Sequence, residues 1–453
     1  MQLQRKLIGL LGAMMPLVAT VHAQQQAPAT QGVQPLSVQQ AIDYALANQN
    51  SIKTAKLDEL IALARNKEVS GLALPNISAT GNFQDNPVIQ KQLLDASNFD
   101  PTVPKGTLVP FAFGLKYNAG GQVNINQVLF DPSVLVALQA RRTLEELANK
   151  NVKKAEIDVK AQVYQSYYSV LSAQKALDFL SGNIGRLEQM LNETNEIYKN
   201  GLAEKLDVDR LTVQVTNLRT EQTRLRNMIE VTTASLKYQI GMPLNQPVQF
   251  TDTLDVNVAR TMEDVSGFNY TERIEYQLLD AQKRANEYNL KRYRLAHLPT
   301  LSAFANGGAS RQTNKFDYLG SEMWYGYVSW GLNLNVPIFN GNQRKRQTEQ
   351  AYLEVEKSSV AINNVKLGID LERQTSATTF RNNVLSLEAQ EKNMGLAQEV
   401  LSVTRTKYRE GVGSSLEMIT AENDLLTAQN NYFNALYNAI SAKIDYLKAN
   451  GKL

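Results

Sequence analysis

The chain has 453 residues and a formal charge of +3, from 47 basic and 44 acidic side chains that are interspersed along it. This length is about three times the usual 150 residues of a domain, so the chain forms either several domains or one very elongated one. The mixed charge leaves no basic surface for nucleic acid, and an apolar content of 43% is too low for a multi-pass helical membrane protein.

The N-terminus has the pattern of a secretory signal peptide. A basic pair precedes fifteen nearly uniformly apolar residues, Leu7–Val21, and Ala23 ends a small-residue cleavage site. A transmembrane anchor is the alternative, but it needs about 20 apolar residues, and this run is shorter and contains a proline. We therefore predict a signal peptide over residues 1–23 and a flexible Gln/Ala/Pro-rich leader over residues 24–35.

Two long windows without proline predict four long helices. Residues 133–242 and 338–453 contain no proline, and each window is interrupted by a glycine turn. Proline costs about 3 kcal/mol inside a helix, so its absence over such lengths permits helices on the order of 100 Å long. The predicted helices are 133–199, 203–240, 342–409 and 415–449, and the predicted linker between the two halves is 242–269.

Apolar residues recur four and three positions apart along the second and fourth of these helices, which is typical of helices that pack along a seam. The helix 415–449 has two such stripes, which favours neighbours on two of its sides. An ordinary antiparallel coiled coil is the alternative. The seam of the second helix contains Leu211, Val215, Leu218, Gln222, Leu225, Ile229, Thr232 and Leu236.

The chain contains an internal repeat with an offset of about 210 residues. The tip segment 197–202 returns at 407–412, and Leu74-Pro75 returns as Leu298-Pro299 at a slightly larger offset. We predict two copies of one unit, each with a helix, a Leu-Pro step, two strands and a hairpin of long helices. The first copy covers residues 36–241 and the second covers residues 270–453.

The segments between the helices have the alternation of membrane strands. From residue 324 onward, even positions are mostly apolar and odd positions mostly polar. The predicted strands are about 76–84, 111–130, 300–310 and 324–339. A strand of a soluble β-sandwich is the alternative. The polar face is predicted to line a barrel lumen with Asn124, Asn126, Asn333 and Asn335, and the predicted aromatic girdle contains Trp324, Tyr325, Tyr327 and Trp330.

The predicted number of strands requires more than one chain. Four strands cannot close a barrel, because the smallest membrane barrels have eight, and an open strand edge cannot face lipid. Several chains must therefore contribute to one barrel. Three chains would supply twelve strands around a threefold axis.

These duplicated motifs resemble the TolC-type outer membrane efflux protein family. The markers are the two Leu-Pro steps, the return segment 331–341 and the tips 198–207 and 408–417, in order along residues 36–452. The resemblance implies a homotrimer in the outer membrane of a Gram-negative bacterium, extending into the periplasm. The predicted fold is mainly α with membrane β, in which the two-fold repeat of helical hairpins and β-hairpins forms a trimeric 12-stranded β-barrel continued by an α-helical periplasmic tunnel.

The resemblance also implies partners at the hairpin tips. In the family, these tips close the lower end of the tunnel and meet a periplasmic adaptor protein and an inner-membrane pump of the RND, ABC or MFS type. Nucleic acid is not an expected partner. The candidate docking residues are Gly201, Leu202, Ala203, Gly411, Val412 and Gly413.

The resemblance further implies a periplasmic gate of acidic residues just after the tip glycines. Asp207 and Glu417 occupy the matching positions, and three copies of each would bring six carboxylates near one axis. The pattern departs from the family one turn later, where Thr420 stands in place of a second acidic residue. The alternative role for each carboxylate is to complement the positive end of a helix dipole.

Enzymatic motifs are absent from the sequence. It contains no G-x-S-x-G, P-loop, H-E-x-x-H or EF-hand pattern, no cysteine, and only His22 and His297. We therefore expect no enzyme, no cofactor and no metal site. His297, beside the second Leu-Pro step, is expected to be a rim or packing residue.

Two functions are compatible with this reading. The first is a passive exit duct of a tripartite efflux or type I secretion system, gated at its periplasmic end. The second is a structural trimeric coiled-coil protein of the cell envelope, which would not need rows of lumen-facing asparagines. Within the first, the sequence does not separate drugs, metals, other small molecules and proteins as cargo, because the pump selects it.

Overall fold

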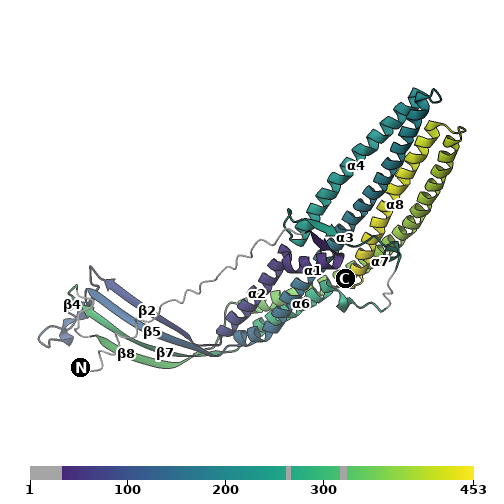
Figure 1. Ribbon diagram of the computed structural model, residues 1–453. Helices are drawn as coiled ribbons and strands as arrows, with labels where there is room; N and C mark the ends of the chain where they lie inside the picture. The colour runs from purple at the N-terminus through teal and green to yellow at the C-terminus, as the bar shows by residue number, and fades with distance from the viewer. Residues whose placement is uncertain (1–32, 262–266, 317–323) are drawn as a thin grey trace.

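The structure, a computed structural model, describes residues 33–261, 267–316 and 324–453. The predicted signal peptide, 1–23, and residues 24–32 of the predicted leader lie outside the described residues. The described chain is elongated, with a β-sheet at one end and the free tips of two helical hairpins at the other (Figure 1).

Four long helices form the two hairpins. They are α3 (Pro132–Lys199), α4 (Lys205–Ile240), α7 (Gln343–Arg409) and α8 (Ser415–Ala449). Pro132 suits the first turn of α3 because that position needs no backbone donor, and the Asp131 carboxylate accepts a 2.7 Å hydrogen bond from the Ser133 amide. In Figure 1 the hairpins lie side by side in the order α4, α3, α8, α7.

Shorter helices pack beside the long ones. α1 (Val38–Asn48), α2 (Asn50–Gly71) and α6 (Ile274–Leu295) pack against α3, whereas α5 (Val256–Arg260) packs against α8. Short 3-10 helices lie at Ala96–Asn98 and Tyr270–Glu272. The first copy of the repeat has two helices, α1 and α2, where the second has α6. The break falls at Gln49, whose extended backbone ends α1 and whose side chain caps α2.

The membrane-strand segments form one four-stranded antiparallel sheet in the order β2-β5-β7-β8. These strands are β2 (Asn76–Asp85), β5 (Tyr117–Phe130), β7 (Thr300–Thr313) and β8 (Tyr325–Asn335). β8 ends four residues before the predicted bound of 339; Pro337, which has no amide hydrogen, lies just beyond it.

The predicted strand 111–130 is wrong at its start. Its first residues belong to a separate hairpin of β3 (Lys91–Asp95) and β4 (Leu108–Ala112), and β5 begins only at Tyr117. β4 is itself apolar, so the sequence pattern runs from β4 into β5 without a clear break.

The last residues of the predicted flexible leader are ordered. β1 (Gln34–Leu36) pairs in parallel with β6 (Val248–Phe250), which lies inside the predicted linker. The hydroxyl of Tyr167 on α3 donates a 2.8 Å hydrogen bond to the backbone oxygen of Leu36. The leader is therefore held against α3 from residue 34 onward.

Apolar packing continues along the helical hairpins rather than forming one compact core. One buried cluster joins β1 and α1 to α3 and α4, and another joins α3, α4, α7 and α8 nearer the tips. Four residues of the predicted seam in α4, Leu211, Val215, Leu218 and Leu236, are buried. Among the described residues, no helix is both long and apolar enough to span a membrane.

Candidate functional site

One face of the four-stranded sheet is polar along its length. Side chains alternate between faces along a strand, and residues directly opposite in antiparallel strands share a face. Asn124 on β5 pairs with Ser78 on β2 and with Asn306 on β7. This register places all four predicted lumen residues, Asn124, Asn126, Asn333 and Asn335, on one face, which we call the polar sheet face.

The other face of the sheet is mostly apolar and open to its surroundings, with the buried Arg311 toward the end remote from the helices. Val328 and Trp330 of β8 are each 82% exposed in the single chain, which is far more than an apolar side chain in a packed core. This apolar sheet face carries Ile77, Ala79, Val123, Ile125, Ala305, Val328, Trp330, Leu332 and Leu334. Such a surface suits contact with lipid.

Three of the four residues of the predicted aromatic girdle lie on β8, and they divide between its two faces. Trp330 lies on the apolar sheet face and Trp324 precedes β8, whereas Tyr325 and Tyr327 lie on the polar sheet face. The physical reason is the two-residue alternation of a strand, which sends Tyr327 and Trp330 to opposite sides. Two tryptophans therefore remain as girdle candidates.

Tyr327 bridges the polar sheet face. Its hydroxyl donates a 2.6 Å hydrogen bond to Oε1 of Gln122, two strands away. Gly308 on β7 lies between them in the register, and a Cβ there would come within 2.9 Å of the Gln122 Cβ. The glycine thus leaves room for the tyrosine side chain to cross β7.

The two hairpin tips have the same backbone structure. Gly201 and Gly411 both have φ of 73°, a left-handed conformation that glycine adopts without strain. The next residues, Leu202 and Val412, are 82% and 78% exposed. Their amides donate to the carbonyls of residues 197 and 407, both at 3.0 Å. Each tip thus presents one apolar side chain outward on a fixed turn; Ala203 and Gly413, which follow, are half-buried.

The two predicted gate carboxylates have different surroundings. Asp207, in the first turn of α4, is half-buried and accepts a short hydrogen bond from the Ser415 hydroxyl at the start of α8. A guanidinium nitrogen of Arg210 lies 3.8 Å from the same carboxylate. Glu417 is exposed, and its amide donates to Ser414, so its carboxylate takes no part in that cap. The structure does not pair the two carboxylates directly within one chain.

Sequence reasoning missed a buried polar group between α3 and α8. Glu422 is only 4% exposed, and a guanidinium nitrogen of Arg186 lies 3.8 Å from its carboxylate. Burial raises the pKa of Glu422, although the nearby charges of Arg186 and Arg405 act in the opposite direction. Asn183 accepts from Arg186 and donates a 2.8 Å hydrogen bond to Gln429.

A signal for this group exists in the sequence. Met418, Glu422, Leu425, Gln429 and Tyr432 follow one another four and three residues apart, which is the spacing of a helical seam. All five are buried. A carboxylate and an amide at seam positions therefore indicate a polar layer inside the packing.

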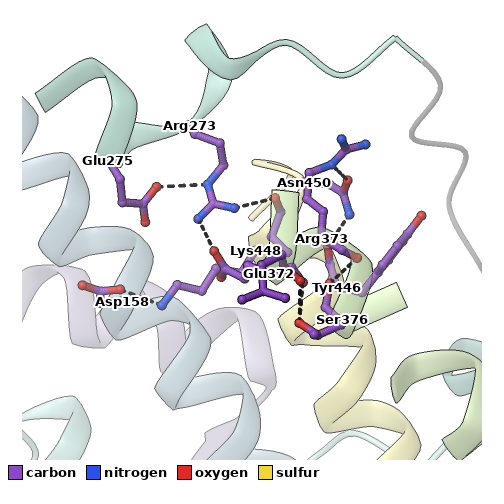
Figure 2. Close-up of polar contacts among 12 residues, drawn as sticks. Asp158, Arg273, Glu275, Glu372, Arg373, Ser376, Tyr446, Lys448 and Asn450 are labelled. Carbon is purple, nitrogen blue, oxygen red and sulfur yellow. Dashed lines mark hydrogen bonds and ion pairs between the residues drawn. The ribbon is translucent and has the colours of Figure 1, made fainter. Parts of the chain in front are cut away.

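A second polar group joins three helices near the middle of the molecule. Arg273, 3% exposed, donates to Glu275 at 3.0 Å, to Glu372 of α7 at 2.7 Å and to the carbonyl of Ala449 of α8 at 2.5 Å (Figure 2). Burial lowers the pKa of Arg273, but the hydrogen bonds to the two carboxylates outweigh this and raise it. The guanidinium is therefore firmly charged. We call this set the Arg273 cluster.

Further contacts extend the Arg273 cluster to α3. Lys448 of α8 forms a 2.8 Å ion pair with Asp158 of α3, and Arg373 of α7 donates a 2.9 Å hydrogen bond to Asn450 after α8 (Figure 2).

His297, at the end of α6, has its Nδ1 2.7 Å from the Arg294 carbonyl oxygen. In the described part of the chain, no three His, Asp or Glu side chains are grouped to hold a metal ion.

Comparison with known proteins finds similar proteins among outer membrane channels. Residues 276–451 match the family model described as outer membrane efflux protein. The resemblance to that family is confirmed. The chain is 21% identical to the proteases secretion protein PrtF of Dickeya chrysanthemi, over 73% of this chain and 72% of that relative. It is 22% identical to the outer membrane protein TolC of Vibrio cholerae, over 73% and 76% of the two chains.

The crystal structure of the outer membrane protein VceC from Vibrio cholerae has the same fold. The TM-score is 0.68 at 15% identity, covering 91% of this chain and 96% of that chain. The predicted fold class and the predicted outer membrane location are confirmed. The family is one of outer membrane channels.

Proposed function

We propose that three copies of this chain form a passive outer membrane duct for efflux or type I secretion. The observation that carries the proposal is the sheet, which has one polar and one apolar face and ends at β2 and β8 within the described residues. Strand edges cannot face lipid, so β2 of one copy pairs with β8 of the next. Twelve strands then enclose a lumen lined by the asparagines of the polar sheet face.

The helical hairpins continue this duct into the periplasm. α4 and α7 lie at the two sides of the hairpin row in Figure 1 and bury few side chains in the single chain. In a closed ring, α4 of one copy lies against α7 of the next. The duct itself has no catalytic role, and energy and cargo selection come from the partners.

The proposed partners are a periplasmic adaptor protein and an inner-membrane pump, and the proposed docking points are the two tips. Leu202 and Val412 support this because they are apolar, strongly exposed and held on identical turns. The similar proteins carry names for both protein secretion and toluene efflux, which leaves the pump type and cargo open.

We further propose that Asp207 and Glu417 form the periplasmic gate. Both lie in the first turn of a helix that follows a tip, and Asp207 reaches across to Ser415 at the start of α8. The two carboxylates therefore lie at one level of the hairpins. A purely structural coiled-coil stalk is the alternative, but it gives no reason for a polar sheet face opposite an apolar one.

Reconstitution tests this proposal directly. The mature protein is expected to fractionate with outer membranes, to run as a trimer in mild detergent and to form conducting channels in planar bilayers. Leu202→Lys together with Val412→Lys is expected to abolish export in cells while leaving the trimer and the channel intact. A monodisperse monomer that is soluble without detergent would contradict the duct, and normal export by the double variant would contradict docking at the tips.

A further inference from the structure

The β3–β4 hairpin, residues 86–116, is an apolar element with little cover. It interrupts the connection between β2 and β5 and lies at the end of the sheet remote from the helices (Figure 1). Its large apolar side chains are unusually exposed for a folded hairpin. They are Val88 at 88%, Leu93 at 64%, Phe99 at 69%, Leu108 at 59%, Phe111 at 50% and Phe113 at 55%.

Both faces of this hairpin are apolar. The register pairs Leu93 with Pro110 on one face and Leu94 with Val109 on the other. Phe111 shares the second face, and its ring stacks on Phe99 with a centroid distance of 6.1 Å. A hairpin on a lipid surface would bury only one face, and this one also carries charged residues, which lipid disfavours. Two apolar faces therefore point to protein contact on at least one side.

Two hydrogen bonds at the base of the hairpin tie it to the sheet. The Asn86 amide donates a 2.7 Å hydrogen bond to the Lys116 carbonyl, and the Lys116 amide donates a 3.1 Å hydrogen bond to Asn314. An isolated two-stranded hairpin is marginally stable in water, so this element gains from a surface to pack on. An exposed apolar patch of this kind typically marks an interaction site.

The sheet order shows where such a surface lies. The hairpin emerges from the end of β2, at Asp85, and β2 is an edge strand. The aromatic start of β8, Trp324 and Tyr325, lies at the same end of the sheet and is 42% and 60% exposed. Within one chain β2 and β8 are three strand spacings apart, roughly 14 Å, whereas β8 of a neighbouring copy would be one spacing away, about 4.8 Å.

We propose that the β3–β4 hairpin packs on Trp324 and Tyr325 of the next copy of this chain, as a clasp across the seam between neighbouring sheets. The inference rests on the proposed three-chain duct, in which β2 and the neighbour's β8 run antiparallel. It assigns a role to Trp324 and Tyr325 at the outer rim, apart from the proposed gate and docking tips. The contact adds apolar burial between copies at the end of the barrel remote from the helices.

Cysteine cross-linking tests the clasp, because the chain has no cysteine of its own. The test variant carries Phe111→Cys with Trp324→Cys, and a second carries Leu93→Cys with Trp324→Cys to probe the other face. The matched control pairs Leu74→Cys with Trp324→Cys, since Leu74 is 65% exposed but lies at the helix end of β2. Each purified trimer is oxidised or treated with a short bismaleimide and then run on a denaturing gel.

At least one hairpin variant is expected to give covalent dimers and trimers as its main bands, reversed by reductant after oxidation. The control and the single-cysteine variants are expected to stay monomeric. A trimer in mild detergent without cross-links in either hairpin variant would overturn the clasp and leave the proposed duct standing. Cross-linking of the single-cysteine variant Phe111→Cys would show that the hairpins of neighbouring copies contact each other. This result would overturn the proposed contact with Trp324 and Tyr325. Loss of the trimer in the unmodified chain would overturn the duct and the clasp together.

Discussion

The two copies of the repeat build the same hairpin but bury opposite helices of it. In the first copy the long helix α3 buries 19 of its 68 residues, while α4 buries 5 of 36. In the second copy the long helix α7 buries only 6 of 67, while α8 buries 16 of 35. The repeated sequence therefore determines that each copy folds into a helical hairpin. The position of a helix in the row of four determines how many of its side chains are buried.

This difference also explains the edges of the molecule. α3 and α8 lie in the middle of the row and α4 and α7 at its sides, just as β5 and β7 lie inside the sheet and β2 and β8 at its edges. The exposed apolar side chains of α4 and α7, such as Val231 at 68% and Leu371 at 64%, therefore lie on the surfaces that the proposed trimer would bury between copies.

The largest expected effect comes from removing a buried side chain from an inner helix. Leu425 of α8 is 2% exposed, and Leu425→Ala removes its packing and leaves a cavity, at a cost of about 2–5 kcal/mol. Val231→Ala on α4 is the comparison and is expected to cost less than Leu425→Ala, because only the proposed contact between copies covers Val231. Thermal unfolding followed by helical circular dichroism measures both. Equal losses would mean that burial in the single chain does not separate inner from outer helices.

The next effect concerns the outer helices as interfaces. Val231→Lys together with Leu371→Lys places charges on both sides of the proposed contact between copies, so the trimer is expected to dissociate while helix content stays the same. Native electrophoresis in mild detergent measures this. Leu202→Lys, at a tip that is 82% exposed, is the control and is expected to leave the trimer intact. A stable trimer of the double variant would mean that neighbouring copies meet through other helices.

A smaller effect is expected from the two copies of the gate position. Glu417 is exposed, whereas Asp207 is already bound by Ser415 and lies near Arg210. Glu417→Gln is therefore expected to lower the cation preference of single channels more than Asp207→Asn does. The double variant is expected to lower it furthest and to weaken block by multivalent cations. Unchanged selectivity in the double variant would remove both residues from the constriction.

The smallest effect is a pH dependence at the α3–α8 contact. Because the pKa of Glu422 is raised in the folded chain, its contribution to stability is fully present below the unfolded pKa and is lost as pH rises through the folded pKa. Glu422→Gln is therefore expected to stabilise the protein at neutral pH and to flatten this dependence. Arg186 and Arg405 are the basic residues whose charges act on Glu422. A melting temperature with the same pH profile in both proteins would contradict this assignment.

Much of this architecture was predictable because it depends on local signals. The absence of proline and the glycine tips placed the long helices, since both act through the backbone of a few residues. The alternation around Asn124 and Asn333 put the polar residues on one sheet face for the same reason. These signals need no knowledge of distant contacts.

What sequence reasoning missed depends on tertiary placement. The stretch around Phe111 is as apolar as a membrane strand, and only the pairing of β4 with β3 separates it from β5. Tyr325 and Tyr327 are the exception, because the local alternation of β8 is enough to place them on the polar sheet face. Glu422 occupies a seam position of α8, but its burial becomes visible only in the packing against α3.

The Arg273 cluster anchors α7 at one point along its length. It fixes α7 near Glu372 to the end of α8, and the 37 residues of α7 from there to Arg409 form an arm of about 55 Å. A tilt of about 5° at such a pivot would carry the tip sideways by roughly 5 Å, with no change inside the helix itself. A partner that moves a tip therefore acts at the end of a long arm, and the movement also has to shift the packing of Phe380, Leu387 and Leu401 against the neighbouring helices.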